Sequence, residues 1–564
     1  MAGVIAAARG YCGGLLRYSL LWLLLAASAQ AAGPGNAAIA SAHPLANAAG
    51  YEVLEAGGNA FDAAVAVSAA LAVVEPNATG LGGGGFWLLH RAEDSFEVLV
   101  DGRERAPAAA SANMFLDERG EPVPGLSRNT ALASGIPGQA AGLIHIAKTY
   151  GKLTLAQNLA PAIRLAREGF PMYPRLQGGL KYKQGQLLTN HAGKVFLPGG
   201  KVPELGQLVT NPELADALVL LARNGRDGFY AGEQARRMVE GVRGLGGIWT
   251  EADLADYQVV ERAPLKTRYK DMVITGGPAP AGGVVLAEAL NILEPYELNK
   301  LDGTTRAHLV VEALRRAFRD RGQYLGDPDF VTIPMQRLVH PYYADGQRAS
   351  IRLDKATPSD SLPGLSAWEA AGTNTTHFSI LDAEGNRVSA SMSLNFWFGN
   401  GIMIPNTGVV LNNEMDDFSV KPGVADGFQL VGADANVIVP GKRMLSSMAP
   451  TWAESDHGLL ILGTPGGSRI ISMVLLGVLA WSEGADAEHI VARPRFHHQY
   501  MPDVITYEDN AFSDDQLRAL ESMGHRLELS GRRYGNMEAI TWDYASGEVK
   551  AASDPRGDGE GRVY

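Results

Sequence analysis

The sequence has almost no cysteine, because the 564-residue chain contains Cys12 and no other. Cys12 lies in an N-terminal segment with the features of a secretory signal, so the mature chain is expected to contain no thiol. Catalysis by a cysteine nucleophile and zinc sites built on thiolates are therefore excluded. An exported chain without disulfides has to be held together by packing alone.

The N-terminal segment, residues 1–31, is predicted to be a signal peptide. Arg9 and Arg17 give it a basic start, residues 19–27 form an apolar stretch too short to span a bilayer, and residues 29–31 match the Ala-x-Ala cleavage pattern. An amphipathic N-terminal anchor is the alternative. The mature protein is expected to be periplasmic or secreted.

The chain also lacks positive charge and long apolar runs. Lys and Arg number 49 against 61 Asp and Glu, a formal net charge of −12, so nucleic acid is not an expected partner. After the signal segment no apolar run is long enough for a membrane span. Glycine, in contrast, is abundant, with 67 residues largely in short clusters, which indicates tight turns and close backbone approaches.

Hydrophobic periodicity predicts a helical first part and a β-rich last part. Helices are expected at residues 45–56, from 61 to 74, and at 155–168, 211–224, 231–243, 283–293, 304–326 and 468–481. Strands are expected at residues 86–90, 376–382, 387–394, 408–412 and 458–463. Residues 355–374, rich in Ala, Ser, Gly and Pro, are interpreted as a flexible linker.

The end of this linker suggests a specific chemistry. If the bond between Asn374 and Thr375 were cut, Thr375 would gain an α-amine that could act as the base for its own hydroxyl. A hairpin turn at residues 383–386 would place Thr375 opposite Ser393 to Asn395, which offer a hydroxyl and an amide on one strand face. An ordinary surface hairpin explains the same local pattern, since threonine favours strands.

A second feature is the glycine turn at residues 463–467, between the strand 460–462 and the helix from Ser468. Backbone N–H groups at a helix start can bind an anion or stabilise an oxyanion. A plain strand-to-helix connection is the alternative interpretation.

Several short motifs are more specific than this spacing. The second half of the chain contains Thr-Thr-His-Phe-Ser at 375–379, Leu-Asn-Asn-Glu-Met-Asp-Asp-Phe at 411–418, Leu-Ser-Ser-Met at 445–448 and Pro-Gly-Gly-Ser-Arg at 465–469. The first half adds Gly-Gly-Asn-Ala at 57–60, the glycines and Phe of 82–86, and Asp-Gly-Arg-Glu at 101–104. In this order the motifs resemble those of the γ-glutamyltranspeptidases (γ-glutamyltransferases), bacterial exported type, and the resemblance covers essentially the whole mature chain.

The resemblance implies an α+β fold, a four-layer αββα sandwich of the N-terminal nucleophile hydrolase class. It implies a precursor that cleaves itself at Asn374–Thr375 into a large subunit, residues 32–374, and a small subunit, residues 375–564, which form one domain as a heterodimer. Thr375 would attack the γ-carbonyl of glutathione or another γ-glutamyl amide, and the resulting ester would pass to water, an amino acid or a dipeptide. No cofactor and no metal is implied.

The resemblance also implies roles for the residues that match the motifs. Arg103 would grip the α-carboxylate of the donor, a task suited to its planar fork, with hydroxyl donors from Ser446 and Ser447. The α-ammonium would be held by Asn395, Glu414 and Asp417. Oxyanion N–H groups would come from Gly466 and Gly467, where any Cβ would obstruct the approach.

Three positions vary from the pattern of the family. Glu414 stands where some members carry Gln. Ser393 stands where bacterial members have Thr, which keeps the hydroxyl beside Thr375 but loses a methyl group. Phe428 lies in a lid-like loop at about 421–434, where family members often have Tyr. Its ring can still screen the site, but the hydroxyl of Tyr is missing. This difference affects what can be expected of lid closure and of the balance between hydrolysis and transfer.

Some patterns in the sequence are interpreted as structural. The glycines of 80–85 match G-x-G-x-x-G, but they lie between a helix and a strand, the reverse of the dinucleotide-binding order. His377 is left structural, since an N-terminal amine suffices as base. His497 and His498 would point to opposite strand faces and therefore do not suggest a metal site. The charged run 315–321 is expected to be a solvated helix face.

Two alternatives remain beside the transferase. An acylase of the glutaryl-cephalosporin type would share the fold, but a glutaryl group lacks the α-ammonium that Asn395, Glu414 and Asp417 would bind. An inactive protein that binds γ-glutamyl peptides would keep the fold without being cleaved.

Overall fold

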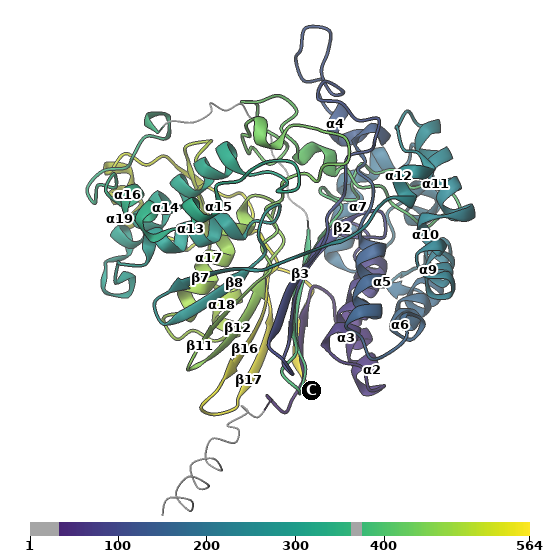
Figure 1. Cartoon of the computed structure of the whole chain (residues 1–564), viewed down its shortest axis with the longest axis horizontal. Helices are drawn as coiled ribbons and strands as arrows, with labels where there is room; N and C mark the ends of the chain where they lie inside the picture. Colours follow the sequence, from purple (N-terminus) through teal and green to yellow (C-terminus); the bar gives the residue numbers. More distant parts are fainter. Residues whose placement is uncertain (1–32, 363–374) are drawn as a thin grey trace, which may run out of the picture.

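The computed structural model describes residues 33–362 and 375–564. The predicted signal peptide, the later part of the predicted linker and Asn374 lie outside these residues. In the described part, two sheets pack face to face and helices cover both outer faces (Figure 1). The predicted αββα sandwich is therefore confirmed. No helix in the described ranges combines the length and apolar character needed to cross a membrane.

The first sheet joins segments from both halves of the chain. Its seven strands are, in spatial order, β18 (Glu560–Val563), β1 (Ala38–Ser41), β9 (Thr376–Leu381), β10 (Arg387–Ser393), β2 (Gly84–Arg91), β3 (Phe96–Gly102) and β6 (Val260–Arg262). The β9–β10 hairpin pairs with β1 on one side and with β2 on the other, always antiparallel. A chain cut just before this hairpin would stay joined by backbone hydrogen bonds along both of its edges.

The second sheet is also antiparallel. Its six strands are β17 (Val549–Ser553), β16 (Glu538–Asp543), β12 (Gly458–Gly463), β11 (Thr451–Ser455), β8 (Met272–Gly276) and β7 (Leu265–Tyr269). Smaller sheets are formed by β13 (Phe496–His497), β14 (Ile505–Tyr507) and β15 (Leu527–Leu529), and by β4 (Phe170–Pro171) and β5 (Leu208–Val209). Strand β2 shows the layering: Trp87 packs into the core under the first helix layer, while Phe86 packs into the core between the sheets.

The helices divide between the two outer faces. On the side of the first sheet lie α2 (Pro44–Glu55), α3 (Ala60–Val74), α5 (Gln139–Thr149), α6 (Leu155–Glu168), α9 (Pro212–Asn224) and α11 (Gly232–Gly244), with the peripheral α4 (Leu126–Asn129), α7 (Pro174–Leu187), α8 (Ala192–Phe196), α10 (Asp227–Tyr230) and α12 (Glu251–Ala255) (Figure 1). On the side of the second sheet lie α13 (Gly283–Leu293), α14 (Gly303–Tyr324), α15 (Met335–Leu338), α16 (Pro341–Arg348), α17 (Arg469–Trp481), α18 (Ala487–Ala492) and α19 (Asp514–Ser522). The long predicted helices are thus confirmed.

Helix α3 shows how local sequence fixes one of these elements. The Asn59 side chain accepts hydrogen bonds from the first N–H groups of the helix, and the Asn59 N–H donates to the Asp62 carboxylate, so N–H groups without a partner inside the helix are satisfied. Every residue of α3 is buried, as its Ala- and Val-rich composition predicts for a helix without a polar face.

The predicted strand at residues 408–412 is wrong. This segment forms one isolated bridge, between Met403 and Val410, and otherwise runs as a loop. Its residue Asn412 donates side-chain hydrogen bonds to the carbonyls of Gly82 and Gly135. The apolar residues of the segment are therefore buried in the core although the segment joins no sheet. The alternation of apolar and polar residues in the sequence does not distinguish these two cases.

The charged run on α14 is a second wrong prediction, because it is buried rather than solvated. Arg315, Arg316, Asp320 and Arg321 are all at most 5% exposed. Arg315 and Arg316 form ion pairs with Glu312, at 3.3 and 2.6 Å. Periodicity shows which residues share a helix face but not whether a second layer of chain covers that face.

Part of that covering layer is the start of the predicted flexible linker. The Ser359 N–H donates to Asp503 at 2.7 Å, and the Thr357 N–H donates to Glu312 at 3.0 Å. The Ala356 N–H donates to the carbonyl of Met523 at 2.8 Å. Residues 355–362 are thus fixed against α14 and its neighbours, and the linker prediction is wrong for this part.

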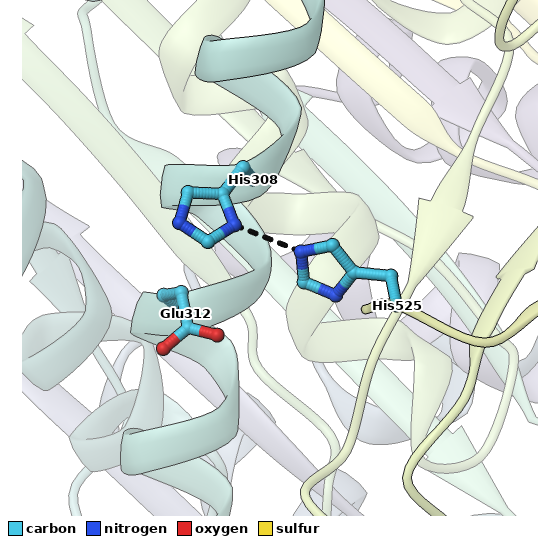
Figure 2. A group of neighbouring side chains, drawn as sticks. All are labelled: His308, Glu312 and His525. Atoms are coloured by element: carbon cyan, nitrogen blue, oxygen red, sulfur yellow. Dashed lines mark hydrogen bonds between the residues drawn. The ribbon is translucent and has the colours of Figure 1, made fainter. Parts of the chain in front are cut away.

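One buried group near this contact has the chemistry of metal ligands: His308, Glu312 and His525 (Figure 2). His308 Nδ1 and His525 Nε2 are 2.8 Å apart, and His308 Nε2 lies 2.7 Å from the carbonyl of Arg352. The Glu312 carboxylate is already engaged by Arg315 and Arg316, whose positive charges oppose a cation at this place. The group therefore fits a role in anchoring residues 350–361.

Candidate active site

Thr375 lies at the start of β9, and the hairpin register places it beside Ser393. Thr376 pairs with Met392, so the preceding residue comes next to Ser393, in agreement with the hairpin arithmetic. The expected strand face does not extend to Asn395, because β10 ends at Ser393 and Asn395 adopts a left-handed conformation with φ of 74°. The Asn395 N–H donates to Ser393 Oγ at 2.8 Å, which fixes this turn beside the hairpin.

Thr375 is buried and lines a small cavity between the two sheets' ends and the loops above them. The cavity is lined by Arg103, Arg321, Thr375, Ser393, Asn395, Glu414, Asp417, Phe428, Leu430, Ser446, Ser447, Met448, Gly467 and Ile470. Every site residue predicted from the sequence is in this set except Gly466, which lines an adjoining pocket on the other side of the glycine turn. The tertiary structure thus brings together motifs from distant parts of the chain.

One side of the cavity holds an acidic cluster around Arg103, which follows β3. Arg103 Nη1 lies 3.0 Å from Glu414 Oε2 and 3.5 Å from Glu104 Oε2, and Nη2 pairs with Asp417. The guanidinium also donates from Nε to the carbonyl of Met444 at 3.2 Å. Arg103, expected to grip a carboxylate, is therefore surrounded by carboxylates of the protein itself.

Glu414 and Asp417 belong to a short 3-10 turn, Glu414–Asp417, that presents both carboxylates to the cavity. The buried atoms Glu414 Oε1 and Asp417 Oδ1 have no hydrogen-bond partner among the described residues. Buried acceptors in native proteins nearly always have partners. A ligand with several N–H donors, such as an ammonium group, would supply them.

Burial controls the protonation of this cluster. It raises the pKa of Glu414 to about 7, against the opposing effect of Arg103. Burial also raises the pKa of Asp417, and the positive charge of Arg103 again opposes this effect. The pKa of Glu104 is raised well above its usual range, because burial and the neighbouring Glu414 act in the same direction. Sequence reasoning missed Glu104, although it follows Arg103 directly in the Asp-Gly-Arg-Glu motif.

Two neighbouring serines also line the cavity. Ser446 and Ser447 sit in an extended segment before β11, held by a hydrogen bond from the Ser446 N–H to the carbonyl of Pro280 at 2.8 Å. Arg321 Nη2 donates to Ser447 Oγ at 3.3 Å. This second guanidinium was also missed, because its charge was assigned to a solvated helix face.

The glycine turn between β12 and α17 contributes Gly467 to the cavity wall. Gly466 has φ of 151° and Gly467 has φ of 60°, a conformation that favours glycine. A Cβ on Gly467 would come within 2.5 Å of Phe428 Cδ1, and one on Gly466 within 2.6 Å of Met473 Cε. The turn is therefore restricted to glycine, and it carries backbone N–H groups at the start of a buried helix.

Phe428 covers the cavity from the loop between η5 (Glu414–Asp417) and η6 (Asp434–Asn436). Its ring stacks on Phe396, with centroids 4.8 Å apart and planes 4° apart. The Gly427 N–H donates to Asp416 Oδ2 at 3.0 Å, and Gln499 donates to the Phe428 carbonyl at 3.1 Å. The aromatic screen is thus fixed from three sides.

Three features interpreted as structural indeed have structural partners. The His377 ring contacts Ser391 Oγ at 2.8 Å and Ser379 Oγ at 3.3 Å, and burial lowers its pKa to about 3. His497 and His498 bind different neighbours, Ser472 and Asp503 respectively. In the glycine run, a Cβ on Gly83 would lie 2.0 Å from the Ser393 carbonyl, so these glycines allow the close approach of β10.

Comparisons with known proteins identify relatives along most of the chain. The sequence model of the family described as Gamma-glutamyltranspeptidase matches residues 46–564. A glutathione hydrolase proenzyme from Pseudomonas sp. (strain A14) is 42% identical over 89% of this chain and 88% of its own, and that of Escherichia coli (strain K12) is 41% identical over 92% and 90%. The solved cephalosporin acylase from Bacillus halodurans aligns with a TM-score of 0.82 at 27% identity, over 94% of this chain and 96% of its own.

Proposed function

Since the chain belongs to the γ-glutamyltranspeptidase family, we propose a mechanism in which Thr375 is both the residue released by self-cleavage and the nucleophile. The protein is a γ-glutamyltransferase and glutathione hydrolase made as a proenzyme. Cleavage of the Asn374–Thr375 bond would give subunits of residues 32–374 and 375–564. The strand pairing of β9 with β1 and of β10 with β2 supports their association without a disulfide.

In the proposed reaction, the free α-amine of Thr375 takes the proton of its own hydroxyl as Oγ1 attacks the γ-carbonyl carbon of the donor. The backbone N–H groups of Gly466 and Gly467 stabilise the oxyanion. The C–N bond then breaks, the amine leaves with the proton carried by the Thr375 ammonium, and a γ-glutamyl ester remains. Water or the amine of an amino acid or dipeptide attacks this ester in the same way and releases Thr375.

The observation that carries the proposal is the complementarity of the cavity to a γ-glutamyl group. The orphaned oxygens of Glu414 and Asp417, with the Asn395 amide nearby, suit the α-ammonium. The hydroxyls of Ser446 and Ser447, together with the positive charge of the arginines that line the cavity, suit the α-carboxylate. Thr375 and Gly467 line the same cavity, which supports an attack on the γ-carbonyl there.

We also propose that the first 31 residues direct export and are removed, so that the enzyme acts outside the cytoplasm. Its substrates are small molecules, and the proposed assembly is the pair of subunits from one precursor.

Donor selectivity tests the proposal directly. A γ-glutamyl anilide is expected to exceed the matching glutaryl anilide in kcat/KM by about 10- to 100-fold, because the glutaryl group leaves Glu414 and Asp417 without their charged donor. Steady-state kinetics with both anilides measures the ratio. An Asp417→Asn variant is expected to narrow it.

Acylase activity on glutaryl donors is the second candidate activity to test, because the fold is similar to that of the cephalosporin acylase from Bacillus halodurans. Equal or faster turnover of the glutaryl anilide by the wild-type chain would support it and contradict the γ-glutamyl proposal. Product analysis with glutathione, with and without glycylglycine, then reports transfer against hydrolysis.

A further prediction concerns how kcat/KM for the γ-glutamyl donor changes with pH on the acid side of its optimum. Glu414, whose pKa is about 7, faces Arg103, Asp417 and Glu104, and it binds an ammonium more strongly when ionised. Below this pKa the carboxyl is protonated and its attraction is lost, so kcat/KM for the γ-glutamyl donor should rise as the pH increases through about 7. The Glu414→Gln variant should lack the part of this pH dependence that comes from the ionisation of Glu414.

The α-amine of Thr375 must also be deprotonated, and ordinary α-amines titrate at a pKa of roughly 7.7–8.0. The part of the pH dependence that comes from the α-amine should persist in the Glu414→Gln variant. The Glu121→Gln variant, a control at an exposed position, should keep both parts of the pH dependence. Identical pH profiles for wild type and Glu414→Gln would show that the ionisation of Glu414 has no part in donor binding.

A further inference from the structure

Arg321 is a buried cation in the wall of the cavity. It lies in the last turn of α14, is 5% exposed and lines the cavity together with Thr375, Ser446 and Ser447. Its main chain belongs to the helix layer of the second sheet, yet its side chain lines the cavity and contacts Ser447.

The guanidinium of Arg321 is incompletely satisfied. Nη2 donates to Ser447 Oγ at 3.3 Å, whereas Nε has no hydrogen-bond partner among the described residues. Nor does any carboxylate in residues 33–362 or 375–564 pair with it within 4.0 Å. A buried charge without a partner is costly, and proteins normally pair it.

The acids near Arg321 do not neutralise it. Asp417 is paired with Arg103 instead. Burial raises the pKa of Asp426 well above its usual range, with Asp417 and Asp416 adding to this effect, which favours the neutral carboxyl. Burial lowers the pKa of Arg321 itself, but a guanidinium retains its charge in proteins.

The two guanidiniums of the cavity are thus in opposite states. Arg103 contacts three carboxyl groups of the protein, those of Glu104, Glu414 and Asp417. Arg321 has a free Nε and already contacts one of the two serines that face it. An incoming carboxylate finds open N–H donors and unbalanced positive charge on the Arg321 side.

We propose that Arg321 determines specificity for the α-carboxylate of the donor, by pairing its charge with that carboxylate and by orienting the Ser447 hydroxyl toward it. This inference rests on the proposed function and adds a second guanidinium to Arg103. The donor carboxylate completes the hydrogen bonding of Arg321, as the donor ammonium completes that of Glu414 and Asp417.

Three anilides that differ in one charged group test this assignment. The γ-glutamyl anilide has both groups, the glutaryl anilide lacks the ammonium, and the 4-aminobutyryl anilide lacks the α-carboxylate. Arg321→Met should lower kcat/KM by about 10- to 100-fold for the two donors that carry the carboxylate, mainly by raising KM. The same enzyme sample should keep the wild-type kcat/KM for the 4-aminobutyryl anilide within about twofold.

Arg321→Lys keeps a charge but not the planar fork, and it should give an intermediate loss. If the Arg321→Met variant does not fold, the Arg321→Lys variant still tests the proposal. Arg306→Met is the matched control, because Arg306 lies on the same helix and pairs with Glu483 away from the cavity. All variants are first checked for self-cleavage on a denaturing gel.

The possible outcomes separate the two proposals. A wild-type enzyme that does not prefer the γ-glutamyl over the 4-aminobutyryl and glutaryl donors contradicts the proposed function itself. A wild-type preference that Arg321→Met and Arg321→Lys leave unchanged overturns only the assignment of Arg321. Equal losses for all three donors would also overturn it, since they would indicate a general structural role.

Discussion

A Thr375→Ala variant is expected to remain one uncleaved chain and to lose turnover by a factor on the order of 10⁴ to 10⁶. The proposed mechanism uses the Thr375 hydroxyl twice, first to cut the Asn374–Thr375 bond and then to attack the donor. Intact mass spectrometry and a denaturing gel measure the first step, and anilide hydrolysis measures the second. The wild-type chain should give two chains whose masses place the cut before Thr375.

Thr375→Ser is the matched control, because it keeps a hydroxyl at the same position and loses only a methyl group. It should still be cleaved and should turn over the donor, at a reduced rate. Cleavage in Thr375→Ala would show that the processing nucleophile lies elsewhere. A wild-type chain that stays whole and inactive would instead support the binding protein without catalysis.

An Arg103→Met variant is expected to lose about 3–5 kcal/mol of stability, because three buried acids would lose their common cation. Arg103 contacts Glu104, Glu414 and Asp417 and is 1% exposed, so solvent does little to weaken these pairs. The kcat/KM for the γ-glutamyl donor should fall by about 100-fold or more, since the acidic cluster that is proposed to bind the ammonium would lose its geometry.

Urea unfolding in the uncleaved Thr375→Ala background measures this loss on a single chain, where two-state analysis is simpler. Arg105→Met is the matched control two residues along, because Arg105 is half-buried and donates to the carbonyls of Gly441 and Asp256 outside the cavity. Arg103→Lys should lose less stability than Arg103→Met. An Arg103→Met variant as stable and as active as the control would show that the acids are neutral and need no counter-ion.

Much of the fold could be predicted from local sequence. The helices at 155–168 and 283–293 have the bounds that were predicted. For the first of them the local cause is visible, because Thr154 and Gln157 form a capping box at its start and Gly169 follows its last residue. The β9–β10 register followed from the hairpin turn, since side-chain alternation fixes what lies opposite Thr375. Asn395 still reached the cavity, but through a turn with positive φ that strand alternation does not predict.

The sequence by itself predicted Thr375 as the nucleophile, the glycine turn and the chemical types of the proposed donor-binding residues. It could do so because each belongs to a short motif that is legible in neighbouring residues. Only the tertiary structure decided which charges balance one another. Arg103 meets Glu414, and Arg321 meets Ser447, across segments more than a hundred residues apart in the chain. Burial and pairing by distant segments set the state of each charge, so one arginine is neutralised while the other stays open for a ligand.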